Sequence, residues 1–310
     1  MKFYNFILVF AFLTINSCCN HPISPIGSKN IKIDSINVEE VAMDTTENTS
    51  GVGFSGVCGD SLFFYDAIYG YFYKLSTNGK IGSRKMGLGH AKGEIPAKVE
   101  FVSYCQQTNQ LICLGGTNDV YIYDEQENVT KRVGIRSCGI DGTYTSSKSY
   151  STWDEIIMTC DNENIYYTIM GEADGTRFYE EEDYFEKAAI IMKTNVLLGT
   201  EEPIGHYSDF YVTNKNSIRH FPHIYFDVET DGSFYVTYQA DSLIYHFDKD
   251  FNVITIFGYK GKGMDTEYST SGVGVESVSK AIEKDYEKVG MYYWIKRTMG
   301  ILLEVIRKMD

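Results

Sequence analysis

Residues 62–80 read LFFYDAIYGYFYKLSTNGK, and this stretch decides the fold. An apolar and aromatic run, Leu62–Tyr65, is followed by a short polar break and a second run that ends at Leu75. The pair Asn78-Gly79 then precedes a further run, and Asn-Gly between two such runs is a strong signal for a β-hairpin. The stretch therefore predicts short antiparallel strands joined by tight turns.

The same arrangement recurs along the chain. Leu62–Tyr65 is followed eleven residues later by Tyr73–Ser76, just as Gln110–Cys113 is followed by Tyr121–Asp124 and Phe234–Thr237 by Tyr245–Asp248. In each copy the second strand alternates apolar and polar residues and ends in Ser or Asp, and a weaker copy starts near Ile165. Repeats of about 40–50 residues made of short strands are typical of a β-propeller. A four-stranded blade cannot bury both of its faces alone, so blades stack radially around a shared core.

These repeats predict an all-β fold, a β-propeller of four-stranded blades over residues 51–310. We expect blades at about 51–97, 98–138, 150–200 and 206–262, followed by an irregular remainder at 274–310. In the remainder, residues 276–288 are charged and predict a short helix, residues 291–295 predict a strand, and residues 301–307 predict a last strand or a short amphipathic helix. No long amphipathic helical pattern lies between residues 51 and 272, which argues against a doubly wound α/β fold.

The bulk composition supports a β fold and excludes one class of partner. Hydrophobic residues make up 43% of the 310 residues, and the chain has 25 Tyr and 18 Phe. Aromatic residues suit the half-buried surfaces of strands. The formal net charge is -14, so the protein repels phosphate backbones and we expect no nucleic-acid partner.

The first seventeen residues predict an export signal. Lys2 precedes the apolar run Phe6–Ile15, which is too short for a membrane helix. The following Ile15-Asn16-Ser17-Cys18 resembles the bacterial lipobox. That resemblance implies cleavage before Cys18, acylation of Cys18 and stable attachment to a membrane through more than one lipid chain. An ordinary secretory signal or a short N-terminal anchor is the alternative.

Residues 18–50 are polar and predict a tether between the membrane and the globular body. Within this tether Ile31–Val38 predicts one short strand, and a role as the first strand of the fold is the alternative. The residues after Cys18 carry no acidic run, so we expect an outer-membrane lipoprotein of the cell envelope that faces the periplasm rather than the cell surface.

The remaining cysteines predict neither a zinc site nor a dense disulfide framework. Cys19 adjoins the lipidation site, and the other five have an odd count and no CxxC spacing: Cys58, Cys105, Cys113, Cys138 and Cys160. Cys113 lies in an apolar run and is expected to pack as a small hydrophobic residue. One disulfide is compatible with export, and the sequence leaves its pairing open.

Taken together, residues 51–295 resemble the exported six-bladed, TolB-like or NHL-like propeller lipoproteins of Gram-negative bacteria. The resemblance rests on residues 62–80 and on Gly87-Leu-Gly-His-Ala-Lys-Gly-Glu94, and it recurs at Ile244–Asp250 and Phe257–Gly261. It implies a six-bladed ring, whereas the repeats account for four blades and part of a fifth. The chain is therefore expected to be a shortened copy, an open propeller or a ring with irregular last blades.

Two glycine-rich stretches have the composition of phosphate-binding loops, GLGHAKGE at 87–94 and GYKGKGMD at 258–265. Neither has the GK[ST] ending and following helix that a P-loop requires. Both lie at equivalent points of the repeat, where Gly tolerates positive φ at a crossing between blades. We therefore expect structural roles for Gly87, Gly89, Gly93, Gly258, Gly261 and Gly263.

Two further clusters are candidate sites. His220 and His223 have HxxH spacing, but residues i and i+3 of a strand point to opposite faces and no further ligand is evident, so they are weak metal candidates. The acidic run Glu180–Asp183 predicts a solvated loop, with a cation site or partner patch as the alternative. No GxSxG elbow or other catalytic arrangement is recognisable, and we expect no catalytic residues and no cofactor.

The sequence thus favours a membrane-anchored binding module over an enzyme. Its Tyr-rich loops suit contact with a glycan, a peptide or an envelope protein, because aromatic faces offer large area at low entropic cost. The alternative is a propeller hydrolase or lactonase-like enzyme with a metal in the central channel. A degenerate copy with reduced function is the third hypothesis.

Overall fold

The structure of the chain is a computed structural model. It describes residues 42–134 except 45, 92, 96–97, 106, 116–118, 125 and 127, and then residues 157–169, 183–258, 276, 279–280, 290–298 and 301–308. Cys18, Cys138, Glu180–Glu182, Gly261 and Gly263 lie outside these described residues, as does the predicted strand Ile31–Val38.

Four antiparallel sheets of four strands and one hairpin make up the described chain. In every sheet the strands are neighbours in chain order. The sheets are β1 (Gly53–Cys58), β2 (Ser61–Asp66), β3 (Phe72–Leu75) and β4 (Ile81–Lys85); β5 (Val99–Cys105), β6 (Gln110–Gly115), β7 (Asp119–Tyr123) and β8 (Val129–Gly134); β9 (Met158–Cys160), β10 (Asn164–Thr168), β11 (Ile191–Asn195) and β12 (Glu201–Ile204); and β13 (Ile224–Val228), β14 (Phe234–Tyr238), β15 (Ile244–Phe247) and β16 (Val253–Phe257). The hairpin is β17 (Gly290–Thr298) and β18 (Ile301–Lys308).

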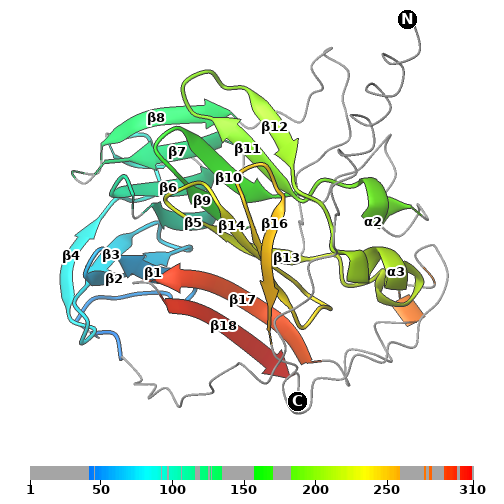
Figure 1. Cartoon of the computed structure of the whole chain (residues 1–310). Coiled ribbons are helices and arrows are strands. Elements are labelled where there is room, and N and C mark those ends of the chain that lie inside the picture. Colours follow the sequence, from blue (N-terminus) through cyan, green and yellow to red (C-terminus); the bar gives the residue numbers. More distant parts are fainter. Residues whose placement is uncertain are drawn as a thin grey trace, which may run out of the picture.

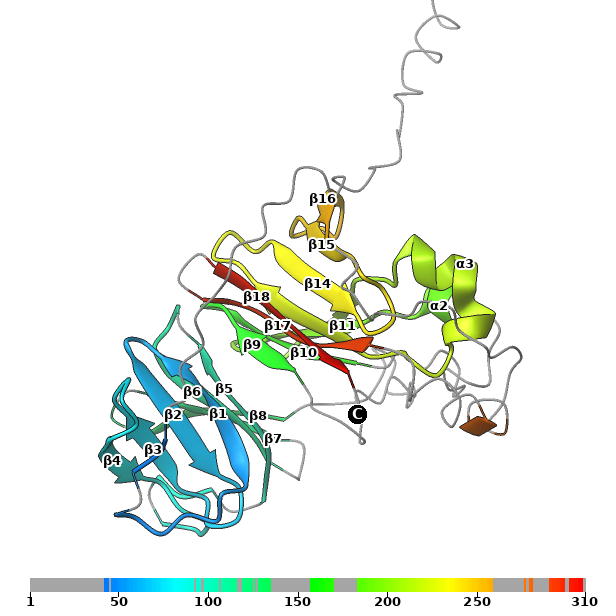
Figure 2. The same cartoon turned by 90° about the horizontal axis from the view of Figure 1, so that it is seen from below.

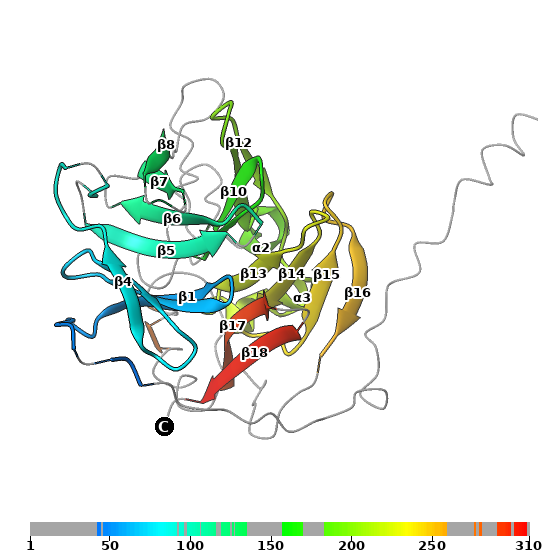
Figure 3. The ribbon, with the colours of Figure 1, turned by 90° about the vertical axis from the view of Figure 1, so that its left-hand side faces the viewer.

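The sheets fan around a common centre (Figures 1 and 3). The first strand of each sheet packs against the first strand of the next, in the order β1, β5, β9 and β13, and β17 follows against β13. The prediction of an all-β propeller with four-stranded blades is therefore confirmed. Two helices are inserted, α2 (Tyr184–Lys187) and α3 (Asp209–Ile218), and they lie side by side near the fourth blade (Figure 2).

The prediction of a six-bladed ring is wrong for the described chain, which has four complete blades. In Figures 1 and 3 the β17–β18 hairpin lies between the fourth and first sheets, where two strands occupy the place of a further blade. Residues 301–308 form a strand, which decides between the two forms expected for the tail. Of the predicted helix at 276–288, the described residues Glu276, Ser279 and Lys280 have helical backbone, and the remainder lies outside the description.

The hydrophobic core lies between neighbouring blades. On β6, Leu111 and Cys113 pack with the first blade, while Ile112 and Leu114 pack with the third. Both faces of β6 are buried, and β7 beside it is buried in the same way. The alternation of apolar and polar residues that the repeat predicted is therefore absent from these inner strands. The outer strands, such as β4 and β8, are half exposed instead.

The repeated sequence pieces are the two middle strands of their blades. Leu62 pairs with Leu75 in the first blade, and Phe234 pairs with Phe247 at the equivalent place in the fourth. In three blades the residue that follows the third strand bonds across the next turn. Asp124 accepts a hydrogen bond from the Asn128 N–H at 2.8 Å, and Asp248 accepts one from the Asn252 N–H at 2.8 Å. In the first blade the Ser76 hydroxyl donates to the Lys80 carbonyl at 3.2 Å. These bonds explain why the repeated pieces end in Ser or Asp.

A disulfide joins the second and third blades. Cys105 at the end of β5 is bonded to Cys160 at the end of β9, with their Cα atoms 5.6 Å apart. Cys58 and Cys113 are free thiols and are buried. Burial raises the pKa of the Cys113 thiol, which keeps it neutral as expected for a small hydrophobic residue.

The last residues of the predicted tether lie against the first blade. The Asp44 N–H donates to the Gly79 carbonyl at 3.0 Å, and Arg84 forms an ion pair with Glu47 at 2.8 Å. The Tyr73 hydroxyl donates to the carbonyl of residue 48 at 3.2 Å. Residues 44–50 therefore belong to the folded body.

Candidate binding face

The connections between strands define two opposite faces of the propeller. One, the turn face, carries the tight hairpin turns, whose described residues are 59–60, 76–80, 124, 126, 128, 161–163, 196–200, 229–233 and 248–252. The other, the loop face, carries the longer connections, of which residues 66–71, 86–91, 93–95, 183–190, 205–223 and 239–243 are described. Binding residues lie preferentially on such loops, because a rigid scaffold positions them.

An exposed apolar cluster lies on the loop face of the first blade. Val52, Ile68, Tyr69 and Leu88 are 58%, 56%, 48% and 42% exposed, and we call these four residues the apolar tip. They come from two loops and from the entry to β1. The Ala67 N–H donates to the Val52 carbonyl at 2.9 Å, which joins the first two segments. Contiguous exposed apolar residues are unusual on a soluble surface and mark interaction sites.

The carboxylate of Asp66 holds the apolar tip in one conformation. It accepts hydrogen bonds from the Ser50 N–H at 2.6 Å, the Ser50 hydroxyl at 2.8 Å, and the Ile68 and Tyr69 N–H groups at 2.9 and 2.8 Å. Burial by itself raises the pKa of Asp66, but the hydrogen bonds from Tyr69, Ser50 and Ile68 outweigh it, and the pKa is below the ordinary 3.8. An ionised carboxylate thus organises the tip before any partner arrives.

Two further contacts shape the tip. Gly70 has φ +71, and a Cβ at this position would lie 2.6 Å from Cγ of Leu88, so only glycine allows the two loops to pack together. Beside them the Arg84 guanidinium lies 4.7 Å from the ring centroid of Tyr71. This cation–π pair places a basic and aromatic edge next to the exposed apolar residues.

Asp66→Asn is expected to lower the free energy of unfolding by about 1–3 kcal/mol at neutral pH, because an amide NH₂ would face the Ser50 N–H donor. Since folding lowers the pKa of Asp66, its stabilisation is present above the ordinary pKa of 3.8 and is lost as the pH falls through the lower value of the folded protein. Urea titrations of both proteins at about pH 7 and about pH 3 measure this difference. An equal difference at both pH values would contradict the assignment.

On the loop face of the fourth blade a buried carboxyl ties a loop to α3. Asp241 accepts hydrogen bonds from the Tyr245 hydroxyl at 2.7 Å, the Leu243 N–H at 3.1 Å and the Ser208 hydroxyl at 3.1 Å. Ser208 precedes the first residue of α3, so this network fixes the start of the helix. Burial raises the pKa of Asp241, and the hydrogen bonds offset this rise only in part.

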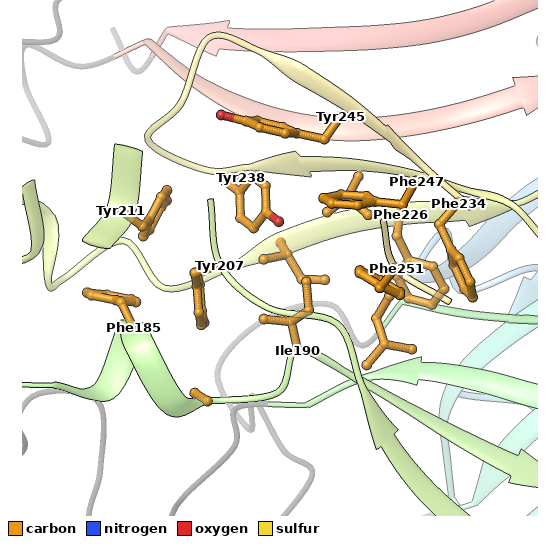
Figure 4. Close-up of a cluster of buried hydrophobic side chains, with 14 of the residues drawn as sticks. Phe185, Ile190, Tyr207, Tyr211, Phe226, Phe234, Tyr238, Tyr245, Phe247 and Phe251 are labelled. Carbon is orange, nitrogen blue, oxygen red and sulfur yellow. The ribbon is translucent and has the colours of Figure 1, made fainter. Parts of the chain in front are cut away.

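Below this network lies an aromatic cluster that joins α2 and α3 to the fourth blade (Figure 4). Three of its tyrosines donate hydroxyl hydrogen bonds to backbone carbonyls of the loops: Tyr207 to Pro222 at 2.6 Å, Tyr211 to Phe221 at 2.7 Å and Tyr238 to His206 at 2.7 Å. Because these hydroxyls anchor irregular backbone, the loops around α3 are held by the core rather than by the sheet.

The predicted blade-crossing glycines that are described lie on the loop face. Gly87 and Gly89 pair with Ile95 through backbone hydrogen bonds of 2.9 Å each, between β4 and β5. Gly93 has φ +86 and Gly258 has φ +150, whereas Gly87 and Gly89 lack the positive φ that was expected of them. At Gly258 a Cβ would lie 2.5 Å from the carbonyl oxygen of Ser242, so close approach of two backbones requires glycine there.

The two candidate histidines lie in the connection between α3 and β13, not on a strand. The ring of His220 is buried and lies 3.9 Å, between centroids, from that of Phe221, while the carbonyl of His223 accepts the Gln239 N–H at 3.0 Å. Within the described ranges, no three or more His, Cys, Asp or Glu side chains are grouped closely enough to hold a metal ion.

The last residue of the acidic run stands at the N-cap position of a helix. Asp183 precedes α2 and forms an ion pair with Lys187, while Tyr184 and Phe185 of the same helix are buried in the aromatic cluster. None of the helices that can be described is both long and apolar enough to cross a membrane.

Sequence reasoning missed the apolar tip, because the break between Tyr65 and Phe72 was treated as polar. It contains Ile68 and Tyr69, two large apolar residues in a turn. Turns are normally built from Gly, Pro, Asn, Asp and Ser. Apolar residues in a turn that also contains a capping Asp are the signal that could have identified this surface.

Comparisons with known proteins support the fold and show no function. No protein-family model matches the chain, and no curated protein matches its sequence. A solved structure of a member of the DUF4221 family from Bacteroides vulgatus matches with a TM-score of 0.61 and 13% identity, over 84% of this chain and 72% of that one. A Bacteroides fragilis protein named as exported matches with a TM-score of 0.48 and 12% identity, over 86% and 68%. At this identity the first likeness shows a shared fold alone, and the chain is a β-propeller similar to the DUF4221 protein.

Proposed function

We propose that this protein is an exported, lipid-anchored binding module that contacts a glycan, peptide or envelope protein through the apolar tip on its loop face. The observation that carries the proposal is the tip itself: four exposed apolar side chains on loops that an ionised carboxylate and a glycine contact hold rigid. A surface organised in advance loses little conformational entropy on binding.

Two observations support the cell-envelope location. The Cys105–Cys160 disulfide favours an oxidising compartment, because structural disulfides are rare in the cytosol. The predicted export signal and Cys18 support the same location, with acylation of Cys18 as the anchor and the periplasm as the compartment.

The chemistry of the apolar tip indicates what kind of partner it fits. The tip is aromatic and aliphatic with Arg84 at its edge, which suits a partner that has an apolar face.

The double variant Ile68→Ser/Tyr69→Ser is expected to weaken binding to the partner at least about tenfold, because exposed anchor residues at a binding surface contribute about 1–2 kcal/mol or more. Glycan arrays and affinity capture from envelope extracts, run with the native chain and the variant in parallel, identify signals that depend on the tip. The matched control is Leu197→Ser/Leu198→Ser, which removes two exposed apolar residues from the turn face. If every signal survives in the tip variant, the tip is not the binding site.

A further inference from the structure

A second exposed apolar feature lies on the opposite, turn face. Leu197 and Leu198, in the hairpin turn between β11 and β12, are 80% and 77% exposed and are the most exposed large hydrophobic residues of the described chain. No other described hairpin turn projects two large aliphatic side chains into solvent. Full burial of one leucine side chain is worth about 1.5–3 kcal/mol, so leaving both in water has a substantial cost.

The turn holds both leucines outward. The side-chain oxygen of Asn195 accepts the Leu197 and Leu198 N–H groups at 3.0 and 2.9 Å. Gly199 completes the turn with φ +66 and donates to the Asn195 carbonyl at 2.8 Å. The Val196 N–H donates to the neighbouring turn at the Glu163 carbonyl, at 2.7 Å. The backbone N–H groups of residues 196–199 are thus all hydrogen-bonded, and the two apolar side chains of the turn project from the body.

The N-terminal chain reaches the body on this same face. The Asp44 N–H is bonded to the carbonyl of Gly79, which lies in the turn between β3 and β4. From there residues 44–50 run along the first blade to Asp66 on the loop face before β1 begins. Asp44, close to the start of the described chain, therefore lies on the turn face. The stretch between Cys18 and Asp44 is long enough to span at most about 90 Å.

We propose that Leu197 and Leu198 insert into the surface of the lipid bilayer to which the N-terminus is attached. The placement rests on the lipid anchoring of the proposed function: an anchor that reaches the body at Asp44, on the turn face, keeps the two leucines of that face within reach of the bilayer. Two leucines bind a bilayer weakly alone, and attachment through an acyl group raises their effective concentration at the surface. The apolar tip of the loop face then points away from the membrane, toward its partner.

The charge of the turn face determines which lipid headgroups this face can approach. In the described turns the acidic residues outnumber the basic ones, with Asp60, Asp124, Asp161, Glu163, Glu229, Asp231, Asp248 and Asp250 against Lys80 and Lys249. Anionic headgroups would be repelled by this face. The partner is therefore a bilayer rich in zwitterionic phospholipid.

The test measures partition of the mature chain carrying Cys18→Ser, which has no acyl group, into phosphatidylcholine vesicles by co-sedimentation. We expect the chain with the native turn to bind the vesicles. The double variant Leu197→Ser/Leu198→Ser should lower its partition coefficient at least about tenfold. The matched control, Ile68→Ser/Tyr69→Ser on the loop face, should stay within about twofold of the parent chain. Replacing about a third of the lipid by phosphatidylglycerol should weaken binding.

Three outcomes would overturn the proposal: no binding by the parent chain, equal binding by the leucine variant, or stronger binding to the anionic vesicles. All four substituted residues are exposed, and unchanged urea midpoints will show that the variants are folded. Vesicle binding and partner capture are measured separately, with each double variant serving as the control of the other. A failure of the membrane contact is thereby distinguished from a failure of the partner-binding tip.

Discussion

Removal of the disulfide in Cys105→Ala/Cys160→Ala should lower the free energy of unfolding by about 4 kcal/mol, since a cross-link between residues 55 apart removes that much loop-closure entropy from the unfolded chain. The bond joins the first strands of the second and third blades. These two blades share a core of side chains from β6, β7, β9, β10 and β11. Without the bond their contact depends on this packing alone.

Urea titrations with and without a thiol reductant provide the measurement. Reductant should bring the native protein to the stability of the double variant and leave the variant unchanged. Cys113→Ala is the control, because it removes a buried free thiol and keeps the disulfide, so that it should respond to reductant as the native protein does. A native protein that does not respond to reductant would show that the bond contributes nothing to stability.

The second large effect is expected at Tyr211, which joins α3 to the two loops beside it. Its hydroxyl donates to the Phe221 carbonyl at 2.7 Å and accepts the Ala240 N–H at 2.8 Å, and its ring is fully buried among those of Phe185, Tyr207 and Tyr238. Tyr211→Ala should lower the free energy of unfolding by about 3–5 kcal/mol through the cavity that it leaves.

Tyr211→Phe is the matched variant, since it removes only the oxygen and with it the hydrogen bonds to the Phe221 carbonyl and from the Ala240 N–H. We expect it to cost about 1–3 kcal/mol. Chemical denaturation measures both variants. Equal losses for the two would mean that the hydrogen bonds, not the packing of the ring, dominate, and a negligible loss for Tyr211→Phe would mean that water replaces the hydroxyl.

In the proposed function the two faces of the propeller have separate roles. Asp44 and the two exposed leucines lie on the turn face, and the apolar tip lies on the loop face. Attachment to the membrane and binding of the partner are then separated by the length of the strands. The long connections that carry α2 and α3 are on the loop face and add surface there without disturbing the blades.

The repeat was readable because its physical causes are local. Strand, turn and strand follow each other within twenty residues, and the capping Asp or Ser at the end of each third strand has its partner only four residues away, as with Asp124 and Asn128. The repeats also count four blades, whereas the resemblance implied six. The place of residues 290–308 was not readable in this way, because it depends on contacts between β17 and the fourth blade, and no copy of the repeat covers these residues.

The candidate sites also differ in whether their residues are neighbours in the sequence or are brought together by the fold. Cys18 and its surroundings are a linear motif that a sequence displays in full, whereas the apolar tip combines residues 52, 68, 69 and 88 from separate segments. The pairing of Cys105 with Cys160 could not be chosen among five cysteines, because it requires β5 and β9 to be neighbours.

By itself, then, the sequence determined the β-propeller class and the four-stranded blades, because hydrophobic patterning and turn chemistry act over a few neighbouring residues. Only the tertiary structure decided how the C-terminal hairpin is placed, which cysteines form the disulfide and which residues are exposed on which face. Those properties follow from how the sheets pack around a centre. Packing brings together side chains that are far apart along the chain, and nothing in the sequence near each of them indicates which residue it will contact.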